Sequence, residues 1–236
     1  MLLVCGIGLP VLAAVAFLAI NLGTQRISPA VTLKILAAKI LGWQNEQGDA
    51  WTVFEESIVW NIRTPRVLTA VFVGAALAFA GTLMQGLFRN PLASPGILGV
   101  SAGGALGAVI CIASGWAAAS IWPLPLCAFA GAFITIFTVY ILASQHGDTP
   151  LATLLLAGIA VAAVAGSATS FVIVMSARDS WHVGREIVFW TLGGLDARRW
   201  QHAGIAAAPV TAAVTGCVFL LRDLNIMLLG EEQART

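Results

Sequence analysis

Apolar residues in this chain run in long stretches free of Asp, Glu, Lys and Arg, and the charged residues gather between them. The charge-free stretches are 1–25, 67–88, 90–147, 149–177 and 200–221. A membrane-spanning helix needs about 20 mainly apolar residues, because a charge in the bilayer core costs several kcal/mol unless it is paired or hydrated. Four stretches therefore predict one span each, and 90–147 is long enough for two.

The longest stretch divides at Pro123 and Pro125, since proline lacks the amide donor that a helix needs. We therefore predict an all-α fold, a polytopic transmembrane helical bundle that forms a single domain over 1–236. Residues 1–22 lack a basic start and a clear cleavage site, which favours a span over a secretory signal. The expected spans are 1–22, 67–88, 97–119, 125–143, 151–176 and 203–221.

The segment 89–104 forms a sharp reversal between the second and third spans. Asn90 and Ser94 each precede a proline, and the residue before proline avoids the helical region. Gly96 and Gly99 then permit a tight entry into the next span.

Two longer hydrophilic segments, 26–66 and 178–202, connect other spans. The second carries apolar bulk, including Phe189 and Trp190, between Arg185 and the Arg198-Arg199 pair. This composition suits a short helix at the water–membrane boundary, and a plain loop is an equal alternative.

Composition agrees with a membrane protein: 59% of the residues are hydrophobic and 10% are charged, against about 25% charged in soluble domains. The formal net charge is +1, which argues against the basic surface that nucleic acid binding requires. The four cysteines lie in apolar spans without metal-site or disulfide spacing, so packing between helices explains them best.

No catalytic or metal site is predicted. Gly99 to Gly103 matches the G-x-S-x-G pattern of serine hydrolases, but Ser101 begins a span and has no His or carboxylate between Asn90 and Gln145. The three histidines fall at or beyond helix ends without a second ligand at helical spacing. The chain also has no phosphate-binding loop, so ATP-driven work requires a partner.

Small residues recur at helical spacing on two spans. Gly99, Gly103 and Gly107 stand four residues apart, and Gly158, Ala162, Gly166 and Ser170 repeat the pattern. Such faces allow close helix approach in lipid, although they can also line a passage between helices.

Several ordered segments resemble the FecCD-type permeases, membrane subunits of bacterial ABC importers for ferric siderophores, haem and cobalamin. The resemblance begins with Arg63-Thr64-Pro65-Arg66 and VGAALAFAGTLMQGLFRNPLASPGILGVSAGGALG at 73–107. It continues through LAGIA at 156–160, FWTLGGL at 189–195 and LNIMLLGEEQAR at 224–235. Members of that family usually exceed 300 residues and have about ten spans, so the resemblance implies an incomplete permease with six.

The resemblance implies that Arg63 and Arg66 dock a periplasmic substrate-binding protein. An exposed guanidinium can pair with a carboxylate through two hydrogen bonds, and complementary charge raises the encounter rate. The alternative is that both arginines anchor a helix end at the lipid interface.

The resemblance also implies that 222–236 begins the segment that couples the permease to its ATPase, with Gly230, Glu231 and Glu232 as candidate contacts. A surface helix with acidic residues in its first turn is the alternative. Gly166, Ser167 and Ser170 are candidates for the pathway wall. No cofactor is expected on this chain, because ATP and Mg²⁺ belong to the partner ATPase.

Together these implications describe an iron-chelate import permease in the bacterial inner membrane. It would pair with a second permease copy, with ATPase subunits and with a binding protein. A haem or cobalamin importer, and a non-transporting truncated or structural membrane protein, are the alternatives.

The distribution of basic residues conflicts with the orientation that the family implies. Six spans place both termini on one side, and nine of the 12 basic residues fall on the other side. A count of basic residues would place those nine in the cytoplasm, whereas the family places them outside. The family orientation is preferred, because docking gives an independent reason for arginine there.

Overall fold

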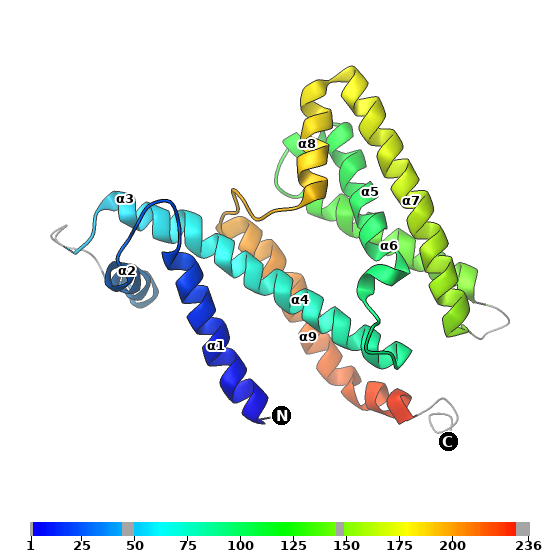
Figure 1. Cartoon of the computed structure of the whole chain (residues 1–236), viewed down its shortest axis with the longest axis horizontal. Helices are drawn as coiled ribbons and strands as arrows, with labels where there is room; N and C mark the ends of the chain where they lie inside the picture. The colour runs from blue at the N-terminus through cyan, green and yellow to red at the C-terminus, as the bar shows by residue number, and fades with distance from the viewer. Residues whose placement is uncertain (1, 44–49, 145–148, 230–236) are drawn as a thin grey trace. The chain divides into compact units, whose positions relative to one another are not determined.

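The computed structural model describes residues 2–43, 50–144 and 149–229, and every regular element within these ranges is a helix (Figure 1). Each of the six predicted spans overlaps one of these helices. They are α1 (Leu2–Asn21), α4 (Thr64–Phe88), α5 (Val100–Ala113), α6 (Pro123–Ala143), α7 (Leu151–Asp179) and α9 (Trp200–Leu229).

The helices differ in how well they match a bilayer. Among the described residues, Val53–Phe88, Pro123–Ala143 and Leu151–Arg178 are long and apolar enough to cross a membrane, and Gly6–Asn21 and Val100–Ala113 are shorter apolar helices. The expected span 97–119 is therefore wrong in extent, because α5 has only 14 residues.

Two glycines explain why α5 is short. Gly99 and Gly115 adopt positive φ angles of 75° and 77°, which interrupt the helix at both ends. Each glycine borders a short 3₁₀ turn, η2 (Pro95–Leu98) before α5 and η3 (Trp116–Ala118) after it.

The predicted reversal at 89–104 is also shaped by prolines and glycines. Helix α4 ends at Phe88, and the side-chain oxygen of Asn90 accepts a hydrogen bond from the backbone N–H of Leu92 at 2.9 Å. The chain then enters η2 at Pro95, and Gly99 turns it into α5. The two prolines and Gly99 therefore end one helix and start the next within about a dozen residues.

The chain forms two compact units, one made of Met1–Phe79 with Leu195–Leu221 and the other of Ala80–Gly194 with Arg222–Thr236. In the first unit, much of the hydrophilic segment 26–66 is helical. It contains α2 (Pro29–Leu41), α3 (Val53–Glu56) and a π-helical stretch, η1 (Ser57–Arg63), that leads directly into α4. Ile20, Ile27, Ile35 and Val59 form the buried core of this unit.

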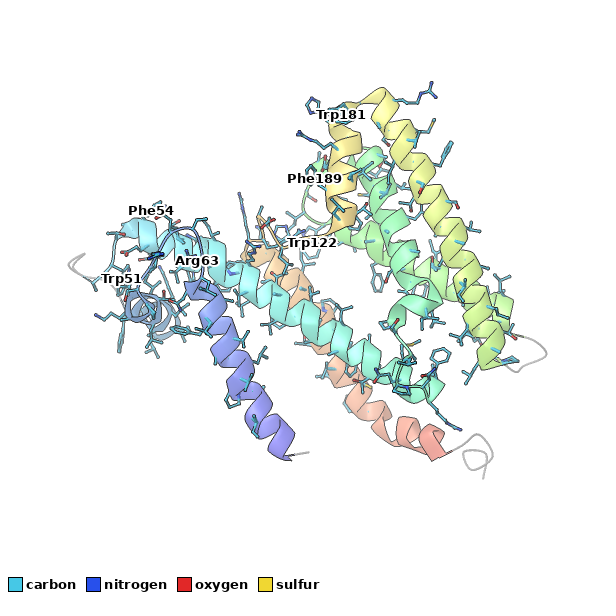
Figure 2. All side chains as sticks on the ribbon, in the orientation of Figure 1. Trp51, Phe54, Arg63, Trp122, Trp181 and Phe189 are labelled. Carbon is cyan, nitrogen blue, oxygen red and sulfur yellow. The ribbon has the colours of Figure 1, made fainter. Side chains whose placement is uncertain are left out.

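In the second unit, α5 contacts α6, α7 and the helix α8 (Trp181–Leu192). Helix α8 answers the question left open for 178–202, since most of that segment is helix rather than plain loop. Its buried Ile187 packs with Val109 and Ile112 of α5, while Trp181 and Phe189 are exposed (Figure 2).

Glycines set the contact between α5 and α6. A Cβ atom added to Gly107 would meet the carbonyl oxygen of Cys127 and lie 3.2 Å from the Cα of Gly131. At the next turn, Gly103 lies against Thr135 and the carbonyl of Gly131. The two backbones therefore approach more closely than side chains would permit, as is typical of helices packed in lipid.

We predict that Gly107→Ala destabilises the second unit by about 1–3 kcal/mol, because the new methyl group meets backbone atoms that cannot rotate away. Gly104→Ala is the matched control, since its Cβ would lie 3.4 Å from the Ala128 carbonyl oxygen, an ordinary contact distance. Loss of helical circular dichroism on titrating micelle-bound protein with denaturing detergent measures the difference. Equal stability of the two variants would contradict the close contact.

Candidate functional site

Arg63, the last residue of η1, points its guanidinium at the end of α1 (Figure 2). Its Nη1 donates hydrogen bonds to the carbonyl oxygens of Ile20 at 2.9 Å and Asn21 at 3.1 Å. Its Nη2 donates to the carbonyl oxygen of Gln25 at 2.6 Å. The residue is buried, with 9% of its surface exposed.

The chemistry of a helix end explains this arrangement. The last carbonyl groups of an α-helix have no N–H partner within the helix and carry partial negative charge. A guanidinium offers several N–H donors in a fixed plane, so one arginine can satisfy several carbonyls at once. Arg63 is therefore a cap for the C-terminal end of α1 and the turn that follows.

Gly23 leaves the space that this cap needs. A Cβ atom at position 23 would lie 2.7 Å from Cζ of Arg63 and closer still to Nη2. Any side chain at this position would therefore displace the guanidinium.

The π-helical stretch η1 accommodates the proline of the Arg63-Thr64-Pro65-Arg66 motif. Proline has no N–H and its ring collides with the carbonyl one turn earlier, which disrupts a regular α-helix. A π segment widens that turn, and the Thr64 hydroxyl donates to the carbonyl oxygen of Val59 at 2.7 Å. The backbone thus continues from η1 into α4 without a break.

Arg66 differs from Arg63 in its surroundings. Its side chain is 55% exposed, and Nη2 pairs with Oδ1 of Asp196 at 3.0 Å. Arg63 is buried and its donors are used inside the chain, whereas the guanidinium of Arg66 is exposed. Docking itself stays a prediction, and the geometry supports it for Arg66.

The turn that carries Asp196 is joined to η1, the stretch that leads into α4. The indole N–H of Trp200 donates to the carbonyl oxygen of Trp60 at 3.0 Å, and the two rings lie 4.6 Å apart. Ala197, between Asp196 and Trp200 in sequence, adopts a left-handed φ of 55°, which bends the chain just before α9. Burial lowers the pKa of His202 in the first turn of α9, and the charges of Arg198 and Arg199 act in the same direction.

The candidate pathway residues lie on an open face of α7. Gly166, Ser167 and Ser170 are exposed, and a Cβ at Gly166 would meet nothing within 4 Å. The Ser170 hydroxyl donates to the carbonyl oxygen of Gly166 at 3.0 Å, so its polarity is partly satisfied by the helix itself. The face is small and mildly polar, as the sequence predicts.

Closer to the N-terminus of α7, small residues face a neighbouring segment instead. A Cβ at Gly158 would lie 2.8 Å from the Ile97 carbonyl oxygen, and a Cβ at Gly99 would lie 3.3 Å from the Cβ of Ala162. Helix α7 therefore uses Gly158 and Ala162 for contact with the entry to α5, and it leaves Gly166 and Ser170 uncovered.

The remaining predicted residues fall in two groups. Gly230, Glu231 and Glu232, the coupling candidates, lie outside the described residues, as does His146. His182 is exposed on α8. Across the part of the chain that the structure describes, no three His, Cys, Asp or Glu side chains gather where they could hold a metal ion.

Sequence reasoning missed Asp196, Trp60, Trp200 and Gly23. The opposite charges of Arg66 and Asp196 were the only indication in the sequence that these residues could interact. Because the two residues are 130 positions apart, no helical spacing predicts that they pair. The carbonyl groups that hold Arg63 leave no trace in the sequence, because every residue has one.

We predict that Arg63→Ala lowers the free energy of unfolding by about 2–4 kcal/mol, because buried carbonyls lose their charged donors and a void remains. Arg66→Ala should cost less than about 1 kcal/mol, since an exposed ion pair contributes little. Unfolding by denaturing detergent, followed by tryptophan fluorescence, compares the two variants. A larger loss of unfolding free energy for Arg66→Ala than for Arg63→Ala would contradict the conclusion that Arg63 supports the fold and Arg66 does not.

Comparison with known proteins shows which proteins this chain resembles. The cobalamin import permease BtuC of Halobacterium salinarum is 45% identical over 182 residues, which cover 76% of this chain and 47% of that protein. The vitamin B12 import permease BtuC of Citrobacter koseri is 37% identical over 188 residues, 80% of this chain and 55% of that protein. The chain spans about half the length of these curated relatives.

A solved structure, described as an inward-facing conformation of a metal-chelate type ABC transporter, superposes with a TM-score of 0.73. It is 26% identical in sequence, and the match covers 97% of this chain and 64% of that one. The prediction of an all-helical membrane bundle is thereby confirmed. The profile described as the FecCD transport family matches residues 11–236, and the chain belongs to that family.

Proposed function

We propose that this chain is the membrane-spanning permease subunit of an ABC importer for a metal chelate, with cobalamin as its cargo. The observation that carries the proposal is the family match over residues 11–236, which includes every described helix from the middle of α1 onward. Cobalamin comes first because two relatives, at 45% and 37% identity, are named as cobalamin or vitamin B12 permeases.

An iron chelate, which the sequence analysis placed first, is the second candidate. It is supported by the structural neighbour, which is described as a metal-chelate type transporter. Cobalamin is itself a cobalt chelate, so one kind of pathway suits both cargoes. Haem remains a third cargo of the same chemical class.

The proposed mechanism needs several partners. A periplasmic binding protein delivers the cargo, two permease copies surround the pathway, and ATPase subunits supply ATP and Mg²⁺ from the cytoplasm. This chain does no covalent chemistry on the cargo. Its helices change packing when the ATPase closes, and the coupling contact is assigned to Gly230, Glu231 and Glu232.

Docking is assigned to the exposed Arg66. Its guanidinium can meet an acidic residue of the binding protein, and Arg63 supports it from within by fixing the helix on which it stands. This assignment places the Arg66 end of α4 on the outer face of the cytoplasmic membrane, as the family orientation requires.

We expect cells that express this chain with its cognate ATPase and binding protein, and lack their own permeases, to accumulate radiolabelled cobalamin. Accumulation should stop when the gene for this chain is removed. A labelled ferric siderophore and labelled haem, offered in parallel, test the other cargoes. If the cells take up the siderophore but not cobalamin, the proposed cargo becomes an iron chelate. If they take up none of the three labelled compounds, the result favours a non-transporting membrane protein.

We expect Ser170→Phe to reduce cobalamin uptake at least tenfold, because the ring would project from the small open face of α7. Phe171→Trp is the matched control, since residue 171 is exposed on the same helix and is already aromatic. Initial uptake rates at equal amounts of membrane protein compare the two. Normal uptake by Ser170→Phe would remove this face from the pathway.

A further inference from the structure

The ion pair between Arg66 and Asp196 differs from the ion pair between Lys39 and Glu56, which also lies in the described part of the first unit. Lys39 pairs with Glu56, and the same carboxylate also accepts a hydrogen bond from Nε1 of Trp51 at 2.9 Å. Within the described part of the chain, Arg66 is the single partner of the Asp196 carboxylate, which is 84% exposed. The Asp196 carboxylate is therefore more easily displaced from Arg66 than the Glu56 carboxylate is from Lys39.

The backbone nevertheless holds Asp196 close to Arg66. Trp200, four residues later, is fastened to the carbonyl oxygen of Trp60, and Trp60 stands six residues before Arg66. The left-handed residue Ala197 closes the turn between Asp196 and Trp200. A carboxylate tethered in this way meets the guanidinium at a high effective concentration, even though each contact is weak.

The charge on this surface depends on that pair. Arg66 and Asp196 neutralise each other, and Arg199 is exposed on the same turn. An acidic partner that approaches this surface can gain the full charge of Arg66 only after Asp196 releases it. The carboxylate of Asp196 thus has the same chemistry as the group that a docking protein would offer.

We propose that Asp196 is an intramolecular competitor for docking, whose carboxylate occupies the Arg66 guanidinium until an acidic residue of the substrate-binding protein replaces it. This inference rests on the proposed function, because it takes Arg66 as the docking residue. The exchange keeps the number of ion pairs constant, so docking gains little affinity at this contact. Release is correspondingly fast, because Asp196 returns as soon as the partner's carboxylate withdraws.

The test measures binding of fluorescently labelled, cobalamin-loaded binding protein to spheroplasts that carry the permease with its ATPase. Spheroplasts expose only the outer face, so binding itself reports the side on which the surface lies. We expect Asp196→Asn to tighten binding by about two- to fivefold, the range that an exposed ion pair supplies. The gain should shrink as salt is raised, because salt screens exposed charges.

Two comparisons separate competition from a general change in charge. Glu56→Gln removes the carboxylate from the Lys39–Glu56 ion pair and should leave binding unchanged. In the Arg66→Gln background, Asp196→Asn should bring no further tightening, because there is no guanidinium left to release. Tightening that persists in that background would show simple repulsion and overturn the proposal.

The outcomes also distinguish this inference from the docking assignment beneath it. If Arg66→Gln weakens binding and Asp196→Asn does not strengthen it, docking at Arg66 stands and competition by Asp196 is overturned. If Arg66→Gln leaves binding unchanged, the docking assignment fails, and the competitor role fails with it. Cell-surface biotinylation confirms that each variant is present in equal amount.

Discussion

The first unit depends on one buried positive charge. A guanidinium removed from water is costly unless its donors are satisfied, and Arg63 meets this requirement with three backbone carbonyls, two at the end of α1 and one in the turn that follows. The same bonds join residues 38 to 43 positions apart, so they fix where the chain leaves α1 and where α4 begins. The core residues Ile20 and Val59 flank this junction.

The second unit holds its helices together by other means. Here α5 and α6 meet at glycines, where the absence of side chains lets backbone face backbone. Lipid gives apolar helices little hydrophobic reason to associate, so α5 and α6 rely on close contact and dispersion. The chain therefore holds its helices together in two ways, with a polar cap at the end of α1 and with close packing between α5 and α6.

Much of this fold could be predicted from the pattern of charges and prolines. The spans follow from the charge-free stretches, and the reversal after Phe88 follows from Asn90-Pro91, Ser94-Pro95 and Gly99. The length of α5 could not be predicted, because apolar sequence continues past Gly115 although the helix stops there. The sequence shows where a segment is apolar, but the end of α5 is seen only in the backbone angles, such as the positive φ of Gly115.

The site was less predictable, because Arg63 and Arg66 are identical in type and only three positions apart. They differ in direction: Arg63 faces the end of α1, and Arg66 faces solvent. The local sequence pattern does not predict which arginine faces which way. The partners of both residues lie far away in sequence. Charge in a motif therefore indicates that arginines are needed without showing what each one contacts.

This division of roles has an evolutionary consequence. An arginine at position 63 is constrained by the folding of its own chain and should change only together with Gly23, whose missing side chain makes room for it. In the proposed docking, Arg66 and Asp196 are constrained instead by the surface of the binding protein. If docking takes place as proposed, co-variation with the binding protein is expected at positions 66 and 196, whereas arginine at position 63 is retained for the fold of the chain itself.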